Sequence, residues 1–288
     1  MKLSVIIISY HSNHLLKKIL KIIPKKYQIL IVENSLLKST KNLEKKFKNT
    51  KVIIPKENLG YAKAFNLAFN ICKNNFILTL TPDTLIKKNV ILEIEKTILK
   101  FKDFTLLAPE YKNQQIYRNF TPIEGEDHKS KRIKKFSIQK VKEIDWCFCI
   151  LNKKKFKKQK ILDEKFFMYF ETIDLCKSLI KLKHKMYIIK ELKFDHLGSS
   201  STIKKYNNEI SMNRNWHFSW SKFYYFRKHH NYLYALKKII PNIYQNIIGI
   251  ILSVLKVNRV DAQLHYASLL GAINAIFLNK SNYRPKLK

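Results

Sequence analysis

The sequence of 288 residues is poor in the residues on which several protein classes depend. It has only four cysteines, which show neither the paired spacing of a zinc site nor the density of a disulfide framework, so we interpret them as reduced cytosolic thiols. The glycine-rich signatures of the P-loop and of dinucleotide-binding folds are both absent. The chain therefore does not bind a nucleotide through either of these motifs.

Acidic residues and arginines are also scarce. The 21 Asp and Glu residues stand against 56 Lys and Arg residues, a formal net charge of +35, and only six of the basic residues are arginines. A nucleic-acid reader more often uses arginine for bidentate contacts with bases and phosphates. Lysine spread along the whole chain gives a diffuse positive field, which suits an anionic membrane surface or a diphosphate substrate at least as well.

Long apolar segments are missing as well. The first apolar run, LSVIII, ends at Ser9 without a cleavage site of small residues, which favours a buried strand over a signal peptide. The most apolar late stretch, IIGIILSVL at 247–255, is too short to cross a bilayer, because a spanning helix needs about 20 apolar residues. It can still lie in a membrane interface.

Short apolar runs alternate with helical patterns over the first hundred residues. The expected strands are 3–9, 28–32, 51–55 and 76–80, and the expected helices are 14–23, 43–47, 61–72 and 90–101. Apolar residues are continuous within the strands, which favours a parallel sheet that is covered on both faces. The predicted fold class is α/β, with a mostly parallel central sheet, helices on both faces and a helical C-terminal extension.

Ligands of such sheets bind beyond the carboxyl ends of the strands. Glu33 follows the second strand, where it can accept hydrogen bonds from a base or ribose, or simply cap a turn. Asp83 follows the fourth strand and suits a divalent cation that takes its other ligands from phosphates, although Thr-Pro-Asp-Thr is also good turn chemistry. NLGYAKAFN at 58–66 precedes and opens a helix whose free amides suit a diphosphate.

Together these stretches carry a resemblance that none carries alone. SVIIISYHS, VENS, NLGYAKAFNLA, TPDT and FFMYFETIDLC occur in the order and at roughly the spacing found in family 2 glycosyltransferases of the GT-A (nucleotide-diphospho-sugar transferase) fold. The chain most resembles the bacterial rhamnosyltransferase-like branch. The resemblance implies a nucleotide-sugar-binding half at 1–110, an acceptor-binding and catalytic half at 111–205, and an aromatic-basic extension at 206–288 that associates with a membrane.

The resemblance also implies roles for residues that match the family's motifs. The residues expected to bind the donor are Ser9, Tyr10 and Glu33 at the base and ribose, and the segment from Asn58 to Asn66 along the nucleotide-sugar pocket, with Gly60 and Lys63 nearest the phosphates. Asp145 and Trp146 lie where the branch places an acceptor-side strand, although the glycine that normally follows is missing.

A divalent metal, Mg²⁺ or Mn²⁺, is part of the same resemblance. TPDT at 81–84 is the counterpart of the family's DXD motif, and Asp83 is its single remaining carboxylate. His196 matches a family histidine that approaches the metal or the diphosphate. The alternative for His196 is a capping or core role.

The expected catalytic base is less clear from the motif. The family usually has the aspartate of a Glu-Asp pair where this chain has Thr172, and a threonine hydroxyl cannot act as a base near neutral pH. Either Glu171 or Asp174 takes the proton, or the chain has lost ordinary turnover. Glu171 is favoured because it borders the position of Thr172.

The implied activity is an inverting sugar transfer in cell-surface polysaccharide synthesis. The donor is expected to be a UDP- or dTDP-sugar, with rhamnose as one candidate, and the acceptor a saccharide or a polyprenyl-diphosphate-linked molecule at the cytoplasmic face of the membrane. One alternative is a nucleotide-sugar-binding protein of the same fold that no longer catalyses. Another is a lysine-rich RNA-binding module that stacks bases on the aromatics of 216–230, although no specific nucleic-acid partner is expected.

Overall fold

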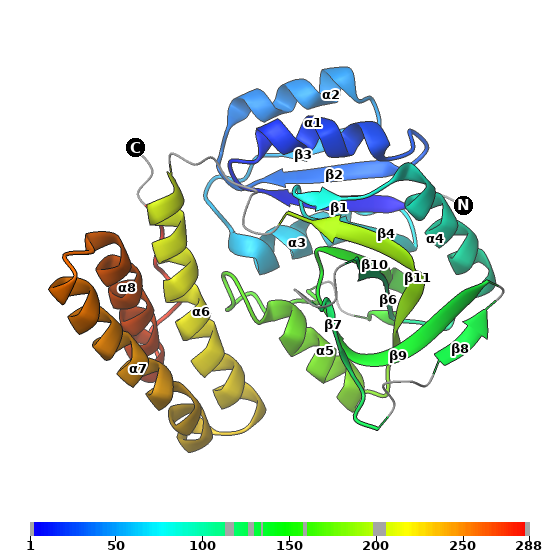
Figure 1. Cartoon of the computed structure of the whole chain (residues 1–288). Coiled ribbons are helices and arrows are strands. Elements are labelled where there is room, and N and C mark those ends of the chain that lie inside the picture. Colours follow the sequence, from blue (N-terminus) through cyan, green and yellow to red (C-terminus); the bar gives the residue numbers. More distant parts are fainter. Residues whose placement is uncertain are drawn as a thin grey trace. The chain divides into compact units, whose positions relative to one another are not determined.

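The computed structural model describes residues 3–112, 118–125, 130–133, 135–157, 160–197 and 206–285. The chain divides into two compact units (Figure 1). The first unit consists of Met1–Leu59, Lys63–Leu162 and Leu175–Thr202, and the second of Gly60–Ala62, Asp163–Asp174 and Ile203–Lys288. The extension predicted at 206–288 thus falls in the second unit, together with two short segments from earlier in the chain.

The strands of the first unit form one sheet. They are β1 (Ser4–Ser9), β2 (Gln28–Glu33), β3 (Thr50–Ile53), β4 (Phe76–Leu80), β5 (Thr84–Leu85), β6 (Leu106–Tyr111), β7 (Phe120–Pro122), β8 (Ser130–Ile133), β9 (Phe136–Ile144), β10 (Phe148–Asn152) and β11 (Met186–His196). Their order is β3-β2-β1-β4-β10-β6-β11-β9-β7, with β5 on β11 and β8 on β9. The first four strands pair in parallel, as do β6 and β11, while β10 runs antiparallel to both of its neighbours. The predicted α/β class with a mostly parallel central sheet is confirmed.

Helices accompany the strands of this sheet. They are α1 (Asn13–Ile22), α2 (Asn42–Lys46), α3 (Gly60–Ile71), α4 (Lys88–Lys100) and α5 (Glu171–Lys181), with short 3₁₀ turns η1 (Lys38–Lys41) and η2 (Lys153–Lys155). The eight elements predicted over the first hundred residues are all present, and each end lies within two residues of its predicted position.

The core of the first unit explains why its strands are apolar without alternation. Val5, Ile6 and Ile7 are all fully buried, so both faces of β1 are covered. Val5 and Ile7 join a cluster with Leu16 of α1 and Ile91 of α4, which therefore cover one face. A strand that is buried on both faces needs an apolar side chain at every position.

The second unit contains α6 (Asn207–His229), α7 (Tyr232–Leu255) and α8 (Arg259–Ile276), each in contact with the other two (Figure 1). Large aromatic residues of α6, among them Trp216, Trp220 and Phe223, pack against small residues of α8, including Ala267 and Ala272. Most of the aromatic residues of 216–230 are therefore core residues of this unit.

Helix α7 differs from the expectation for its apolar stretch. The sequence pattern gave 247–255 as the apolar segment, but the helix continues through Pro241 back to Tyr232 and has 24 residues. By length and composition it is the one helix among the described residues that is able to cross a membrane.

Candidate active site

The carboxyl ends of β1 and β2 bring together Ser9 and Glu33, which are register partners in the parallel pair. Glu33 is fully buried, and its Oε2 accepts hydrogen bonds from Ser9 Oγ at 2.8 Å and from Thr40 Oγ1 at 3.3 Å. Its Oε1 accepts a hydrogen bond from the Ser35 amide at 3.0 Å and another from the Ser35 hydroxyl. Glu33 thus organises the turn after β2, and its contact with a base or ribose stays a prediction.

His11, which the sequence analysis did not single out, follows directly on Tyr10 at this edge. Its backbone has a φ of 52°, a conformation that non-glycine residues seldom adopt outside functional or strained sites. Burial lowers the pKa of His11, and the negative charge of Glu33 acts in the opposite direction. The rings of Tyr10 and His11 meet edge to face at 4.8 Å between their centroids. The signal that would have found His11 is its place two residues after the end of the parallel strand β1.

The TPDT turn after β4 brings Asp83 to His196. Strand β5 pairs antiparallel with the end of β11, which sets His196 opposite Thr84. In this arrangement His196 Nε2 lies 3.0 Å from Asp83 Oδ1. The turn is held to the start of β10, because Thr84 Oγ1 donates to the Cys147 carbonyl at 2.8 Å and the Thr81 amide donates to the same carbonyl at 3.1 Å. Asp83 is therefore part of a tight turn and also paired with the predicted second metal ligand.

The electrostatics of this pair favour charge on both partners. Burial acts to raise the pKa of Asp83, but hydrogen bonds from His196 and Thr81 and the charge of His196 outweigh it, so the pKa is lowered. Burial likewise acts to lower the pKa of His196, but Asp83, Asp145 and Asp195 raise it overall. Asp83 is thus an ionised carboxylate near neutral pH, which is the state that a metal ligand needs.

The two predicted acceptor residues differ in exposure. Asp145 is exposed, and its Oδ1 accepts a hydrogen bond from the Cys147 amide at 3.1 Å. Trp146 is only 2% exposed and packs edge to face on Phe65 of α3, with 5.0 Å between ring centroids. Asp145 is accessible to a ligand in this unit, whereas Trp146 is a core residue; binding of an acceptor by either stays a prediction.

The first residues of α3 belong to the second unit and contact its segment Asp163–Asp174. Gly60 has a φ of +70°, and a Cβ at this position would lie 2.3 Å from the Phe167 carbonyl oxygen. The Tyr61 amide donates to that same oxygen at 2.7 Å, so this amide of the helix start is already used within the protein. Asn58 precedes the helix and is partly exposed, and Lys63 is exposed on its first turn.

The stretch FFMYFE at 166–171 has an unusual backbone. Tyr169 and Phe170 are consecutive residues with φ values of 67° and 65°, a left-handed conformation that costs energy for side chains of this size. Immediately after them, Glu171 is the first residue of α5 and is buried. A carboxylate at this position is stabilised by the positive end of the helix dipole.

Asp174, the other predicted base, sits in an ionic network of the second unit. Its Oδ2 accepts a hydrogen bond from Lys228 Nζ at 2.8 Å, and its Oδ1 lies 2.8 Å from His229 Nε2. Lys228 also reaches Asp163 at 2.7 Å, where Tyr224 OH donates at 2.9 Å. Both carboxylate oxygens of Asp174 are thus engaged by α6, which favours a structural role for this residue.

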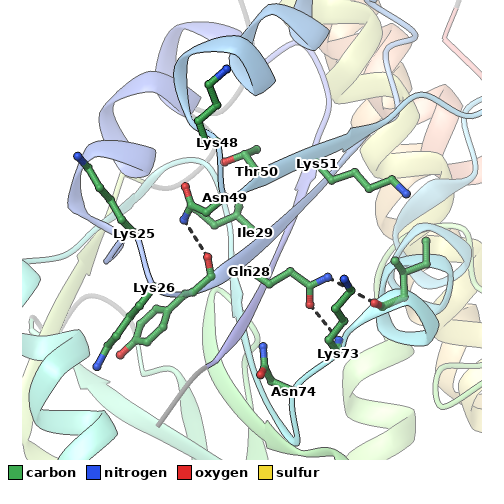
Figure 2. Close-up of a pocket in the computed structure, with 12 residues that line it drawn as sticks. Lys25, Lys26, Gln28, Ile29, Lys48, Asn49, Thr50, Lys51, Lys73 and Asn74 are labelled. Carbon is green, nitrogen blue, oxygen red and sulfur yellow. Dashed lines mark hydrogen bonds between the residues drawn. The ribbon is translucent and has the colours of Figure 1, made fainter.

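A basic recess lies at the opposite edge of the first unit's sheet (Figure 2). Its volume is about 580 Å³, and it is lined by polar and basic side chains that include Lys25, Lys26, Lys48, Lys51, Lys73, Gln28 and Thr50. Gln28 and Thr50 are the first residues of β2 and β3, so the recess lies at the amino ends of these strands. Because donor sites in α/β sheets form at the carboxyl ends, this recess is not the expected nucleotide site.

The described residues limit the kind of metal site that is available. Among them, no group of three or more His, Cys, Asp or Glu side chains is arranged to hold a metal ion. The Asp83 and His196 pair supplies one carboxylate and one imidazole. Such a set fits Mg²⁺ or Mn²⁺ when a substrate diphosphate and water complete the coordination, since these ions commonly take only one or two protein ligands.

Comparisons with known proteins identify the family and the fold of the chain. The sequence profile of "Glycosyl transferase family 2" matches residues 4–159, which include β1 to β10. A sequence search of curated proteins finds no match.

Solved structures share the fold at low sequence identity. A mannosyltransferase of Pyrobaculum calidifontis, PcManGT, in complex with GDP-Man and Mn²⁺ is 10% identical, with 96% of this chain and 88% of that chain covered and a TM-score of 0.57. TarS 1–349 of S. aureus in complex with UDP-GlcNAc is 16% identical, with 95% and 92% covered and a TM-score of 0.50. GalNAc-T7 with UDP, GalNAc and Mn²⁺ is 13% identical, with 85% and 58% covered and a TM-score of 0.55. The predicted GT-A fold is confirmed.

Proposed function

The chain belongs to glycosyl transferase family 2, and from that premise we propose that it transfers a sugar from a nucleotide-diphosphate donor to an acceptor hydroxyl with inversion. The observation that carries the proposal is the 3.0 Å pairing of Asp83 with His196 at the carboxyl end of β4. A diphosphate needs a cationic partner as it leaves, and this pair is the metal-ligating set at the edge where α/β sheets bind nucleotides.

The metal of the proposal is Mg²⁺ or Mn²⁺, held by Asp83 and His196. When bound, it would neutralise the negative charge that develops on the departing diphosphate. Burial acts to raise the pKa of Asp83, but the hydrogen bond and the charge of His196 lower it overall. The Asp83 carboxylate is therefore ionised at neutral pH. It is ready to accept a cation, whereas His196, whose pKa its acidic neighbours raise against the effect of burial, must be in its neutral form before its ring nitrogen binds a metal.

We assign the base to Glu171. In the proposed step the acceptor oxygen attacks the anomeric carbon, the bond from that carbon to the diphosphate oxygen breaks, and the acceptor proton passes to the Glu171 carboxylate. The contacts of Lys228 and His229 with both oxygens of Asp174 support this assignment, since they engage this carboxylate within the second unit.

The donor and acceptor of the proposal follow the resemblance of the chain. We propose a UDP- or dTDP-sugar, with rhamnose as one candidate, and a saccharide or polyprenyl-diphosphate-linked acceptor in cell-surface polysaccharide synthesis. Ser9, Tyr10 and Glu33 would meet the nucleotide. The net charge of +35 supports an anionic acceptor and a location at the inner face of the cell membrane.

A thermal-shift panel of nucleoside diphosphates and their sugars, each with and without Mn²⁺ or Mg²⁺, tests the proposal. A ligand that binds the folded state raises the apparent stability in proportion to the logarithm of its concentration over its dissociation constant. We expect a metal-dependent shift with one nucleotide, and its loss in Asp83→Ala. A panel without any metal-dependent shift would contradict the proposed donor site.

A second candidate function is a nucleotide-sugar-binding protein without turnover. Thr172 at the usual position of the base, together with the engaged carboxylate of Asp174, favours it. Single-turnover sugar transfer distinguishes it from the first proposal, because both proteins would bind the donor.

The RNA-binding alternative has less support, because the aromatic side chains Trp216, Trp220 and Phe223 are buried and cannot stack on bases.

A further inference from the structure

The last turns of α7 have a reversed distribution of polar and apolar side chains. From Asn246 onward the buried residues of the helix are Asn246 and Ser253. The exposed residues are large and apolar, with between 41% and 74% of their surface exposed: Ile247, Ile248, Ile251, Leu252, Val254 and Leu255. A surface helix in water normally buries its apolar stripe and exposes its polar residues. The six exposed residues are called the α7 face below.

The contacts among α6, α7 and α8 resemble those between helices that pack against one another in lipid. Asn246 Oδ1 lies 3.0 Å from His265 Nδ1 of α8, and a Cβ added at Gly249 would lie 2.5 Å from the His265 ring. Between α6 and α8, Ser219 and Ser268 share a hydrogen bond of 2.8 Å. Small residues at the contact and polar bonds between helices are the means by which helices associate when the surroundings are themselves apolar.

Basic residues flank the uncharged segment of α7 that contains the α7 face. No charged residue occurs from Ile239 to Leu255, whereas Lys237 and Lys238 precede this segment and Lys256 and Arg259 follow it. Tyr244, 64% exposed, lies within it. Basic side chains bind anionic headgroups, and tyrosine prefers the boundary between headgroups and acyl chains.

We propose that the α7 face inserts into the interface of an anionic lipid bilayer, with the helix axis in the membrane plane. The in-plane orientation follows from the contacts of α7 with α6, which carries charged residues along its length, among them Arg214, Lys222 and Arg227. A membrane-spanning α7 would draw these charges into the hydrocarbon or lose its partners.

Charge also distinguishes the membrane from a second copy of the chain. A symmetric contact through the α7 face would bring Lys237, Lys238 and Lys256 of two highly basic molecules together, and like charges repel. An anionic bilayer offers the opposite charge outside and an apolar layer beneath it. The proposal requires neither sugar transfer nor donor binding.

Co-sedimentation of the full chain with vesicles tests the proposal. We expect binding to phosphatidylcholine vesicles that contain phosphatidylglycerol, weaker binding to phosphatidylcholine alone, and a loss of at least about tenfold in apparent affinity in Ile248→Glu/Ile251→Glu. The matched control is Leu99→Glu/Leu182→Glu, which places the same two charges on exposed leucines of the first unit and should bind like the wild type.

A fluorescent label tests which surface enters the lipid. All four native cysteines are buried, so a cysteine introduced by Ile251→Cys can be labelled selectively with an environment-sensitive dye. We expect a blue shift of its emission on addition of anionic vesicles and no shift with the label on Leu182→Cys.

Three results would overturn the proposal: no binding by the wild type, equal binding by the α7 double variant and its control, or a wild-type dimer that the α7 variant dissociates while vesicle binding persists. Neither the sugar donor nor a metal ion is added in these vesicle experiments. A failure of membrane binding is therefore distinct from a failure of the proposed transferase function.

Discussion

His196 Nε2 lies 3.0 Å from Asp83 Oδ1, although the two residues are 113 positions apart in the chain. The contact exists because the short strand β5, directly after Asp83, pairs with the last residues of β11. It joins the two residues that the family resemblance assigns to the metal.

This pairing leads to the first prediction. Asp83→Asn keeps the size of the side chain but removes its charge, so we expect the Mn²⁺ concentration needed for half-maximal transfer to rise at least about tenfold, with a smaller rise in His196→Gln. A metal titration of the transfer rate measures both. The control is Asp103→Asn, an exposed acid whose pairs with Lys155 and Lys185 lie on the surface. Equal metal dependence in Asp83→Asn and the control would contradict the assignment.

The second prediction separates the two candidate bases. We expect Glu171→Gln to abolish sugar transfer with little change in the free energy of unfolding. Asp174→Asn should instead lower that free energy by about 2 kcal/mol, because it leaves the buried His229 without its counter-charge and Lys228 with Asp163 alone. Urea unfolding and single-turnover transfer measure the two effects. Normal transfer by Glu171→Gln together with inactive but stable Asp174→Asn would reverse the assignment.

The third prediction concerns acid stability of the second unit. His217 is fully buried, stacks on Phe167, and bonds to Ser281 Oγ and the Tyr283 carbonyl, each at 2.9 Å. The pKa of His217 is lowered to about 3, chiefly by burial and in part by the charge of Arg284, against the raising effect of the hydrogen bond with the Tyr283 carbonyl.

The direction of the pH effect follows from these values. Between pH 6.5 and about 3 the unfolded chain binds a proton at His217 that the folded chain does not bind. Stability from this residue is therefore complete above pH 6.5 and falls by about 1.4 kcal/mol per pH unit below it. His217→Gln should remove this part of the pH dependence of urea unfolding, and the exposed His14→Gln should not. Parallel pH curves for the wild type and His217→Gln would contradict the prediction.

The fourth prediction compares two glycines with positive φ. Gly60 has a φ of +70°, and a Cβ there would lie 2.3 Å from the Phe167 oxygen, whereas Gly125 has a φ of +74° with nothing within 4 Å of its Cβ position. Gly125→Ala should cost only the backbone strain, about 1 kcal/mol of unfolding free energy. Gly60→Ala adds the steric overlap and should cost about 3 kcal/mol or more. Similar losses in both variants, measured by urea unfolding, would show that the chain relaxes around Gly60.

Much of the secondary structure of the first unit was predictable because the sequence patterns that indicate it are local. Continuous apolar runs and helical periodicity depend only on neighbouring residues, and they located eight elements up to α4 but not the two-residue strand β5. The position of Asp83 was also predictable, because parallel strands place their carboxyl ends at one edge of the sheet. The role of Glu33 was left open between ligand contact and turn, and the structure shows four hydrogen bonds that organise a turn.

The residues and their order thus determined the α/β class, the succession of elements and the strand-end acids, since each depends on short-range patterns. Tertiary structure alone decided that His196 meets Asp83, that Asp174 is held by α6, and that α7 turns Asn246 inward and its isoleucines outward. These relations depend on pairing between distant segments. A periodic pattern states which residues share a face of a helix, but the partner that covers this face depends on the packing of the whole unit.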